Sequence, residues 1–561
     1  MRTPLPTLTA RAVRTATTGL VLGLAASAFS AVTVTPAHAA DFDPVPHLVL
    51  DADPGPADSQ PSEVVTLGSR VLYNASAGTA GAELWVSDGS ARGTHVLKDL
   101  RPGDGSYPYH LLTVGSRVFF TADDGTHGRE LWVTDGTAAG TRLVRDISSG
   151  SPSGEPDQLV AVGATVYFTA TDPFNGRELW RSDGTVAGTT LVSDIGAGSD
   201  DAEIQALTRW GKNLVFSATG AGGAEPWVSN GNPGPGTQKL GDINPTGSSA
   251  PRDFTVLGSS IVFTAQSSDG NRELWRSDGT LPVLLKETVP GATGNGQQHL
   301  VAFGDKIVFD AWDGVHGNEL WVTDGTTPGT HMVADLRPGA ESFGPENAVV
   351  YRGSVYFAAA STQTANQLWA TQGTAATTRL VKESVGGTGP SELLAAGGLL
   401  FYCGASGAQG RELWQSDGTT AGTHLTRDIL PGAAESNAQP VAAVSNTLFF
   451  AATEAHGREL WAYTMRPSST SGQRKVATKR AAAKRRIRVA VTVRAAGTTP
   501  TGVVVLRKGS RVVGTATLSG GRAKVRITRK LRKGTHRLRA YYAGSVHAST
   551  SRSKVIKVVV R

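Results

Sequence analysis

The sequence contains a single cysteine, Cys403, among 561 residues, so the chain can form no disulfide bond within itself. Because Cys403 ends the apolar run 399–403, we interpret it as a small buried side chain. Beyond residue 39, no stretch approaches the roughly 18 uninterrupted apolar residues that a membrane-spanning helix needs. Charged residues make up only 18% of the chain, while 68 Gly and 28 Pro indicate many turns. With 39% hydrophobic residues, this composition excludes a disordered chain and is typical of a mostly β protein.

The first 39 residues have the features of a secretory signal peptide. Arg2, Arg11 and Arg14 precede an apolar run, and residues 37–39 read Ala-His-Ala, with small residues at the two positions that signal peptidase recognises. No adjacent pair of arginines in this segment indicates the twin-arginine route. We therefore predict cleavage after Ala39 and a mature protein that is secreted to the extracellular space, with association to the cell wall as a further option.

Acidic residues are absent from the last part of the chain. From Thr464 to Arg561 there are 26 Lys and Arg and no Asp or Glu, whereas residues 40–463 hold 25 basic and all 47 acidic residues, a balance of −22. The mature protein is thus an acidic body with a cationic tail. This asymmetry predicts different partners for the two parts, or a tail that binds a polyanion.

The acidic body consists of repeats. A Glu-Leu-Trp motif or a close variant recurs at spacings of 45 to 48 residues. Its tryptophans are Trp85, Trp132, Trp180, Trp227, Trp275, Trp321, Trp369, Trp414 and Trp461. One full unit, residues 158–195, reads as four short strands rich in β-branched and aromatic residues, separated by turn residues. Four strands in about 47 residues match the size of one blade of a β-propeller.

The ends of the repeat array predict how it closes. The first predicted strand, residues 47–51, matches the fourth strand of the unit, and the last, residues 459–463, matches the third. We therefore predict an all-β chain in which residues 46–463 form a nine-bladed propeller whose ring is closed by the N-terminal strand, with eight or ten blades as alternatives. A basic flexible linker at 464–485 and a small β-sandwich at 486–561 are expected to follow.

The motif carries a family resemblance. Residues 130–137 and 178–185 read Glu-Leu-Trp-Val-Thr-Asp-Gly-Thr and Glu-Leu-Trp-Arg-Ser-Asp-Gly-Thr, which resemble the signature of bacterial ELWxxDGT-repeat proteins. The turn is also similar to those of TolB-like propellers and, more loosely, to Asp-box turns. The resemblance implies an exported repeat protein. The fourth copy departs from the motif with Pro226 and Asn230, and the seventh with Gln367 and Gln372, which argues against one ligand bound identically by every repeat.

The motif itself has a structural interpretation. Asp-Gly favours a tight reversal, and Trp at a fixed strand position packs one blade on the next. Glu two residues before the Trp points to the same side of the strand. An Arg that precedes several copies, such as Arg129 or Arg177, is expected to pair with a neighbouring carboxylate. A catalytic ring of carboxylates is disfavoured, because acid-base catalysis needs two acids in distinct environments.

Loops between the second and third strands contain the candidate ligand residues of the body. Residues 123–128 and 313–317 bring Asp and His together in Gly-containing turns, which makes calcium binding an alternative to a simple polar turn, although the spacing differs from an EF-hand. Apart from calcium we expect no cofactor. Trp312 lies outside the motif, and an exposed Trp312 beside Asp310, Asp313 and His316 would stack on a sugar ring. The other interpretation is a partly buried loop anchor.

The cationic tail predicts a second domain. Strands are expected at 503–506, 511–518, 523–528 and 537–542, and the stretches 499–503, 513–520, 534–536 and 540–544 resemble bacterial Ig-like repeat domains, which implies a stalk or adhesion module. Residues 522–527 alternate cation and apolar residue, so one face packs and the other is basic. The candidate polyanion-binding residues are Arg485, Arg486, Arg522, Lys524 and Arg526.

Three classes of function remain open from the sequence. The first is an exported, non-enzymatic binding or scaffold protein, in which the tail holds an anionic envelope polymer, a polysaccharide or extracellular nucleic acid by salt-sensitive attraction. The second is a propeller hydrolase or lyase that acts on extracellular polysaccharide, which needs irregular polar residues converging in one pocket. The third is a purely structural envelope component. A solubilising basic surface, or docking of the tail on the acidic body, is the alternative for the tail.

Overall fold

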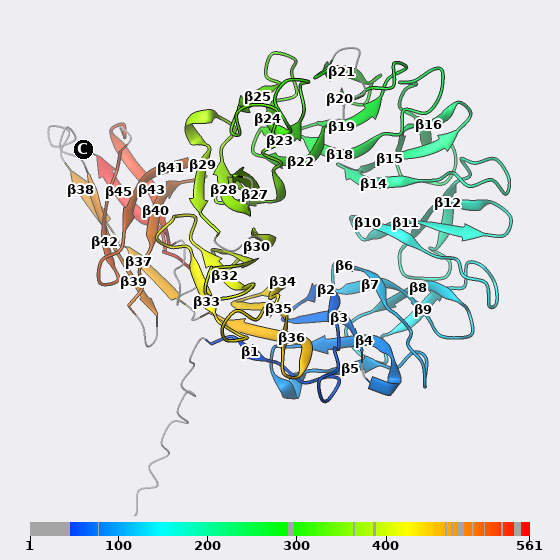
Figure 1. Cartoon of the computed structure of the whole chain (residues 1–561), viewed down its shortest axis with the longest axis horizontal. Coiled ribbons are helices and arrows are strands. Elements are labelled where there is room, and N and C mark those ends of the chain that lie inside the picture. Colours follow the sequence, from blue (N-terminus) through cyan, green and yellow to red (C-terminus); the bar gives the residue numbers. More distant parts are fainter. Residues whose placement is uncertain are drawn as a thin grey trace, which may run out of the picture. The chain divides into compact units, whose positions relative to one another are not determined.

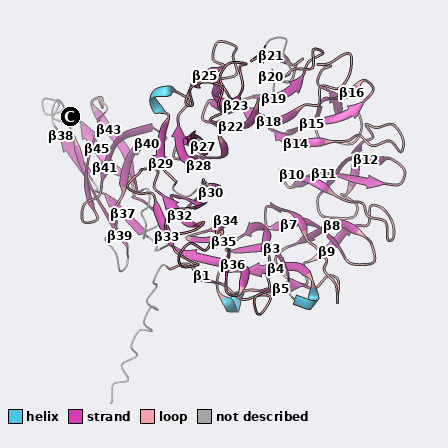
Figure 2. Cartoon of the chain, in the orientation of Figure 1, coloured by secondary structure: helices cyan, strands magenta, loops and turns pink. Residues whose placement is uncertain are grey.

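The structure, a computed structural model, describes residues 45–76, 78–289, 297–362, 365–384, 389–465, 468–472, 475–478, 487–495, 499–509, 511–528, 531–542 and 551–560. The predicted signal peptide and the candidates Arg485 and Arg486 lie outside these residues. Strands dominate the described chain, as Figure 2 shows. The helices among the described residues are three short 3₁₀ turns. These turns are η1 (Gly78–Ala80), η2 (Ala91–Gly93) and η3 (Ala375–Thr377). The all-β class expected from the sequence is confirmed.

The described part of the repeat region forms nine four-stranded antiparallel sheets, coloured from blue to yellow-orange in Figure 1. The first strands are β2 (Ser62–Leu67), β6 (Tyr109–Val114), β10 (Asp157–Val162), β14 (Gln205–Trp210), β18 (Arg252–Leu257), β22 (Gln298–Phe303), β26 (Glu346–Tyr351), β30 (Ser391–Ala396) and β34 (Gln439–Val444). The second strands are β3 (Arg70–Ser76), β7 (Arg117–Asp123), β11 (Thr165–Asp172), β15 (Asn213–Gly220), β19 (Ser260–Gln266), β23 (Lys306–Ala311), β27 (Ser354–Thr362), β31 (Leu399–Gly404) and β35 (Thr447–Glu454).

The third strands carry the Glu-Leu-Trp motif. They are β4 (Ala82–Ser87), β8 (Arg129–Thr134), β12 (Gly176–Ser182), β16 (Gly223–Ser229), β20 (Arg272–Ser277), β24 (Glu319–Thr323), β28 (Ala365–Thr371), β32 (Glu412–Ser416) and β36 (Gly457–Thr464). The fourth strands are β5 (His95–Lys98), β9 (Arg142–Arg145), β13 (Thr190–Ser193), β17 (Thr237–Lys239), β21 (Val283–Lys286), β25 (His331–Ala334), β29 (Arg379–Lys382), β33 (His424–Arg427) and, in the last sheet, β1 (His47–Leu48).

The N-terminal strand β1 completes the last sheet. His47 pairs with Ala462, and Leu48 pairs with Trp461, so the sheet has the order β1-β36-β35-β34. The backbone N–H of Val49 continues the pairing by donating to the carbonyl of Leu460 at 3.0 Å. The permuted pairing of the chain's first and last repeat strands is therefore present in the structure.

Apolar clusters form the cores between consecutive sheets. One of them joins Leu72 and Leu84 of the first sheet to Phe120 and Trp132 of the second. The indole N–H of Trp132 donates to the carbonyl of Ala122 on the neighbouring strand at 3.2 Å, which satisfies the polar group of a buried side chain. The motif tryptophans thus pack one sheet against the next.

The first and last repeat sheets share a core as well. Val71 and Tyr73 of β3 belong to one buried cluster with Phe449 of β35 and Leu460 of β36. Among the first strands, β2 contacts β6, β6 contacts β10, and so on through β30 and β34, and β34 contacts β2.

The C-terminal segment forms a two-sheet sandwich, drawn in orange to red in Figure 1. Its strands are β37 (Ser468–Gly472), β38 (Lys475–Thr478), β39 (Arg488–Ala495), β40 (Val503–Lys508), β41 (Arg511–Thr517), β42 (Arg522–Arg526), β43 (Gly534–Tyr542), β44 (Ser551–Arg552) and β45 (Ile556–Val560). One sheet has the order β37-β39-β42 and the other β38-β45-β43-β40-β41, with β44 beside β43. Buried residues of both sheets, among them Val491, Val525, Leu506 and Leu538, form one core.

The structure differs from the sequence analysis at the predicted linker. Residues 464–485 were expected to be flexible, yet β37 pairs with β39, and β38 pairs in parallel with β45. The sandwich therefore begins at Ser468 rather than at residue 486. Strand β37 reads Ser-Ser-Thr-Ser-Gly and β38 reads Lys-Val-Ala-Thr, so neither has an alternating apolar pattern that predicts a strand. They form because each pairs at an edge of one of the two sheets.

Candidate functional site

The glutamate of the repeated motif is a buried acceptor for backbone amides. Glu412 is fully buried on β32 and accepts hydrogen bonds from the backbone N–H of Ile429 at 2.9 Å and of Ser436 at 3.1 Å. The hydroxyl of Ser436 donates to the same carboxylate at 2.7 Å. These donors lie on the segment that leads from one sheet to the next. Equivalent bonds to connecting segments are made by Glu83, Glu130, Glu178, Glu225, Glu273, Glu319 and Glu459.

Burial raises the pKa of the motif glutamates Glu83, Glu130, Glu178, Glu273, Glu319, Glu412 and Glu459. The pKa rises to about 7 in Glu130, Glu178, Glu273 and Glu319, because desolvation outweighs the hydrogen bonds that favour the carboxylate. The same environment recurs in eight repeats and its donors are backbone amides and neighbouring side chains. The motif glutamates therefore hold the connecting segments in place. Their raised pKa values follow from burial at a repeated structural position, and no catalytic role is needed to explain them.

The Asp-Gly-Thr turn of the motif is also structural. Asp183 accepts hydrogen bonds from the backbone N–H and the hydroxyl of Thr185 at 2.9 and 2.7 Å, which lowers the pKa of its carboxyl. Gly184 has a φ of +87°, a backbone conformation that residues with a Cβ rarely adopt. The hydroxyl of Ser182 accepts from the N–H of Gly184 at 2.9 Å. These bonds within the turn fix its shape, and the carbonyl of Asp183 accepts from Arg117 of the neighbouring sheet at 2.9 Å.

The four candidate ligand residues Asp310, Trp312, Asp313 and His316 do not form one site. Asp313 accepts from the N–H of His316 and contacts its ring at 2.8 Å, which closes a tight loop between β23 and β24. Asp310 lies on β23, where it is buried and hydrogen-bonded instead to His299 of β22 at 2.9 Å. Trp312 is half-buried rather than exposed. Asp124 and His127 make the same loop in the second sheet, at 2.8 Å.

No group of three or more His, Cys, Asp or Glu side chains is arranged to hold a metal ion within the part of the chain that the structure describes. The Asp-His turns at 124–127 and 313–316 contribute one carboxylate and one imidazole each, and in both the carboxylate already accepts backbone N–H groups. The geometry of these turns is thus accounted for by hydrogen bonds within the loop.

Residues that differ from repeat to repeat, most of them polar, occupy the start of the first strands. The second residue of eight first strands has a φ between 50° and 59° and lies within a β-bulge. These residues are Glu63, His110, Gln158, Ala206, Asp253, His299, Asn347 and Glu392. The ninth position is Pro440, whose ring fixes a negative φ. Unlike the motif residues, the side chains at this position differ from one repeat to the next.

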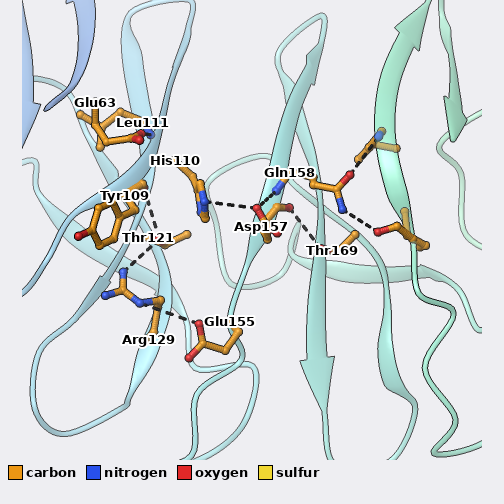
Figure 3. A network of polar contacts seen from close by, with 12 residues as sticks. Glu63, Tyr109, His110, Leu111, Thr121, Arg129, Glu155, Asp157, Gln158 and Thr169 are labelled. Carbon is orange, nitrogen blue, oxygen red and sulfur yellow. Dashed lines mark hydrogen bonds and ion pairs between the residues drawn. The ribbon is translucent and has the colours of Figure 1, made fainter. Parts of the chain in front are cut away.

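In the first three sheets the bulge side chains reach the next sheet, as Figure 3 shows. Glu63 accepts from the backbone N–H of Leu111 at 3.2 Å, and the ring of His110 contacts Asp157 at 3.3 Å. Gln158 donates to the carbonyl of Ile204 at 2.7 Å and accepts from the backbone N–H of Leu207 on β14 at 3.1 Å. These residues therefore connect neighbouring first strands.

The arginines that precede the motif donate hydrogen bonds to backbone carbonyls just before the first strands. Arg129 donates to the carbonyl of Tyr107 at 2.8 Å, and Arg177 donates to that of Glu155 at 2.9 Å. The carboxylate of Glu155 lies farther from Arg129, at 3.9 Å (Figure 3). The expected carboxylate pairing is thus secondary. The left-handed backbone of Tyr107 and Glu155, with φ of 46° and 44°, turns their carbonyls toward the guanidinium groups.

In the sixth sheet the bulge side chain turns back to its own sheet. The side chain of His299 is 53% exposed, and its Nδ1 lies 2.9 Å from Asp310, whose side chain is 5% exposed. Desolvation raises the pKa of Asp310. A cavity of about 10 Å³, the room of a single water molecule, borders both residues. The arrangement is an exposed imidazole oriented by a buried carboxyl.

The outer face of the sheet β37-β39-β42 carries cations. Val489, Val491, Val493, Ala523 and Val525 point into the core, so strand alternation places Arg488, Arg494, Arg522, Lys524 and Arg526 on the outside. We call these five residues the first cationic face. Arg488 and Arg526 are directly opposite each other, and Lys524 is opposite Ala490. The structure thus brings the predicted residues of β42 together and adds Arg488 and Arg494, which sequence analysis missed because β39 was not recognised as a strand.

Comparisons with known proteins support the C-terminal domain. Residues 475–561 match the family of bacterial Ig-like domains (group 3). A comparison with curated proteins found no match.

Solved structures similar to the chain include one from a study of two prolyl endopeptidases, with 14% identity and a TM-score of 0.37, covering 59% of this chain and 50% of that one. A mutant puromycin hydrolase has 15% identity and a TM-score of 0.34 at 63% and 61% coverage. The β-propeller domain of the trilobed protease from Pyrococcus furiosus has 11% identity and a TM-score of 0.34 at 67% and 99% coverage. The chain spans 50% to 61% of the first three structures it matches.

None of the helices among the described residues has the length and apolar character to cross a bilayer.

Proposed function

We propose that this chain is an exported, non-enzymatic scaffold protein whose Ig-like domain attaches it to an anionic polymer of the cell envelope through the first cationic face. The repeat domain then serves as the platform for recognition. The observation that carries the proposal is the cross-strand pair of Arg488 and Arg526, extended by Lys524 and Arg522, in a segment with no acidic residue.

Like charges directly opposite each other on a sheet destabilise it. In this segment no Asp or Glu side chain is available after Glu459 to offset that repulsion. An anionic polymer that lies along β42 would meet cations at Arg522, Lys524 and Arg526, spaced by about 6.7 Å along the strand. Binding would therefore relieve the repulsion and release counterions, which makes the affinity salt-dependent.

We further propose that the nine sheets are the blades of one closed propeller and that the array belongs with the ELWxxDGT-repeat proteins. The pairing of β1 with β36, the core shared by Val71 and Phe449, and the contact of β34 with β2 support closure. The recurrence of the buried motif glutamate and of the Asp-Gly turn supports the family assignment. A secretory signal at residues 1–39 would place the protein outside the cell.

The test uses the mature chain, residues 40–561, and immobilised poly(glycerol phosphate), double-stranded DNA and neutral dextran. Two charge reversals, Arg522→Glu with Lys524→Glu, are compared with Arg92→Glu plus Lys212→Glu, which change the net charge equally at exposed positions of the repeat domain. We expect salt-dependent binding to poly(glycerol phosphate) and no retention on dextran.

The reversed face should weaken binding and lower the slope of log affinity against log salt by roughly 1.4, about 0.7 for each lost contact with a flexible chain. The control pair should leave the slope unchanged. Retention on the polymer that is insensitive to salt, or an equal effect of both variants, contradicts the proposal. Stronger retention on DNA than on poly(glycerol phosphate) assigns the face to nucleic acid instead.

A hydrolase or lyase acting on polysaccharide is the second candidate, and the observation that favours it is the His299–Asp310 pair. A buried carboxyl that holds Nδ1 leaves Nε2 of an exposed imidazole available as a general base. If this candidate is correct, polysaccharide cleavage by the chain is lost in His299→Asn and is reduced in Asp310→Asn. Absence of cleavage across plant and bacterial polysaccharides would eliminate it.

A further inference from the structure

We propose that the Ig-like domain has a second polyanion-binding face on its other sheet, so that one molecule bridges two chains of the same anionic polymer. The inference rests on the proposed function of the first cationic face and extends it from attachment to cross-linking. The second face is made of Arg507, Arg537, Arg539 and Lys557, and we call it the second cationic face.

Strand alternation places these four cations on one side of the sheet. On β43, His536, Leu538 and Ala540 are buried, whereas Arg537 and Arg539 are exposed between them. On β45, Lys557 is exposed between two buried residues. The second cationic face is thus the outer surface of a sheet whose inner side forms the core.

The register of the strands brings the four cations side by side. Arg537 is directly opposite Lys557, and Arg539 is directly opposite Arg507. The guanidinium of Arg507 lies over the ring of Tyr541, 5.5 Å from its centroid, which fixes its position on the same face. The guanidinium of Arg539 donates to the carbonyl of Ser553 at 3.2 Å. Two cross-strand pairs of like charge therefore form one patch on this sheet, whereas the first cationic face has one such pair, Arg488 with Arg526.

The two cationic faces point in opposite directions. Val491 and Val525 of the sheet β37-β39-β42 and Leu506 and Leu538 of the other sandwich sheet lie in one core. The outer surfaces of the two sheets are therefore turned away from each other. Packed sheets are separated by about 10 Å, and the cations extend outward from both. A polymer chain that follows the strands of one face does not reach the other, and each face is left to bind its own chain.

Charge complementarity selects an anionic occupant for both faces. The segment after Tyr463 holds 26 basic and no acidic residues, so no carboxylate side chain within the domain neutralises either patch. One cationic face would suffice for attachment. Like-charged pairs on both sheets lower the stability of a small domain. A polyanion bound to each face would offset the repulsion on that sheet.

The experiment uses the mature chain and two samples of short poly(glycerol phosphate), one labelled with a donor fluorophore and one with an acceptor. Energy transfer between the labels reports bridging, and anisotropy of the donor sample alone reports binding. The variants are Arg522→Glu/Lys524→Glu on the first face, Arg537→Glu/Lys557→Glu on the second, a combination of these four substitutions, and the control Arg92→Glu/Lys212→Glu. Light scattering of the protein alone establishes that each variant is monomeric, and circular dichroism that it is folded.

We expect wild type and control to produce energy transfer that disappears in excess protein, when each molecule holds one chain. Each single-face variant should keep binding, weakened less than tenfold, and lose at least nine-tenths of the energy transfer. The variant with both faces reversed should lose binding altogether. Full energy transfer in the second-face variant overturns the bridging proposal and leaves attachment intact. If neither face variant changes binding, the proposed function fails together with it.

Discussion

Replacing the buried motif glutamate Glu412 by alanine tests the role assigned to the most regular residue of the repeats. Glu412→Ala removes the acceptor of the backbone N–H groups of Ile429 and Ser436 and of the Ser436 hydroxyl, all within 3.1 Å. The segment between β33 and β34 then keeps its donors but loses the group that satisfies them. We expect this segment to open locally and the repeat domain to lose stability.

The magnitude follows from the number of orphaned donors. Each buried donor left without a partner costs about 1–3 kcal/mol. The two amides lose their acceptor outright, whereas the Ser436 hydroxyl retains the carbonyl of Arg411 at 3.3 Å, so we expect a loss of roughly 3–5 kcal/mol. Hydrogen exchange of the peptide covering residues 428–438 should accelerate by about 10² to 10³ fold or more, since 1.4 kcal/mol corresponds to a factor of ten. The tryptophan fluorescence of the repeats reports the accompanying loss of global stability in urea.

Glu412→Gln is the matched control, because Gln367 occupies the equivalent position of the seventh repeat and its sheet still forms. The amide oxygen can accept part of the hydrogen bonds, so we expect about half the destabilisation of the alanine variant. If Glu412→Ala exchanges as slowly as wild type over residues 428–438, or is within 1 kcal/mol of its stability, the motif glutamate does not hold the connecting segment and the reasoning is refuted.

Three further predictions follow from the described geometry. Because burial raises the pKa of Glu178 to about 7, above the unfolded value of 4.5, folding takes up a proton between these values; the stability that Glu178 contributes is largest below pH 4.5 and declines as the pH rises to 7, by roughly 3 kcal/mol. Urea titrations of wild type and Glu178→Gln from pH 4.5 to 8 should therefore show a steeper decline in wild type, and parallel curves contradict the assignment. Cys403 is buried and its pKa is raised to about 11, so a thiol reagent should modify it only after denaturation, and rapid labelling of the native chain would contradict its position in the core. Deleting residues 40–50 removes β1 and leaves β36 with an unpaired edge, so thermal denaturation should occur earlier and light scattering should detect self-association; an unchanged, monomeric variant would argue against ring closure.

Much of the fold was predictable because its determinants are local. Asp183 and Gly184 define their turn from adjacent residues, and alternating apolar residues define the strands on either side. The recurrence of Trp132 and its equivalents at a constant spacing identified the unit, since a buried tryptophan at one strand position must repeat wherever the same sheet interface repeats.

The candidate sites were harder to predict because they depend on register. Asp310 was grouped with Trp312, Asp313 and His316 from proximity in sequence, but strand geometry points Asp310 to His299 and leaves the other three in a separate loop. The bulge residues, such as His110 and Gln158, differ from one repeat to the next, so no recurring motif in the sequence marks their position.

The sequence by itself determined the all-β class, the four-stranded unit, the division between acidic body and cationic tail, and the alternation of cations on β42. These features follow from composition and short-range patterns. Only the tertiary structure decided which cations meet: the pairing of Arg488 with Arg526, and of Arg537 with Lys557, joins strands that are far apart in the chain. Cross-strand register is set by the packing of a common core, so no local pattern in either strand contains it.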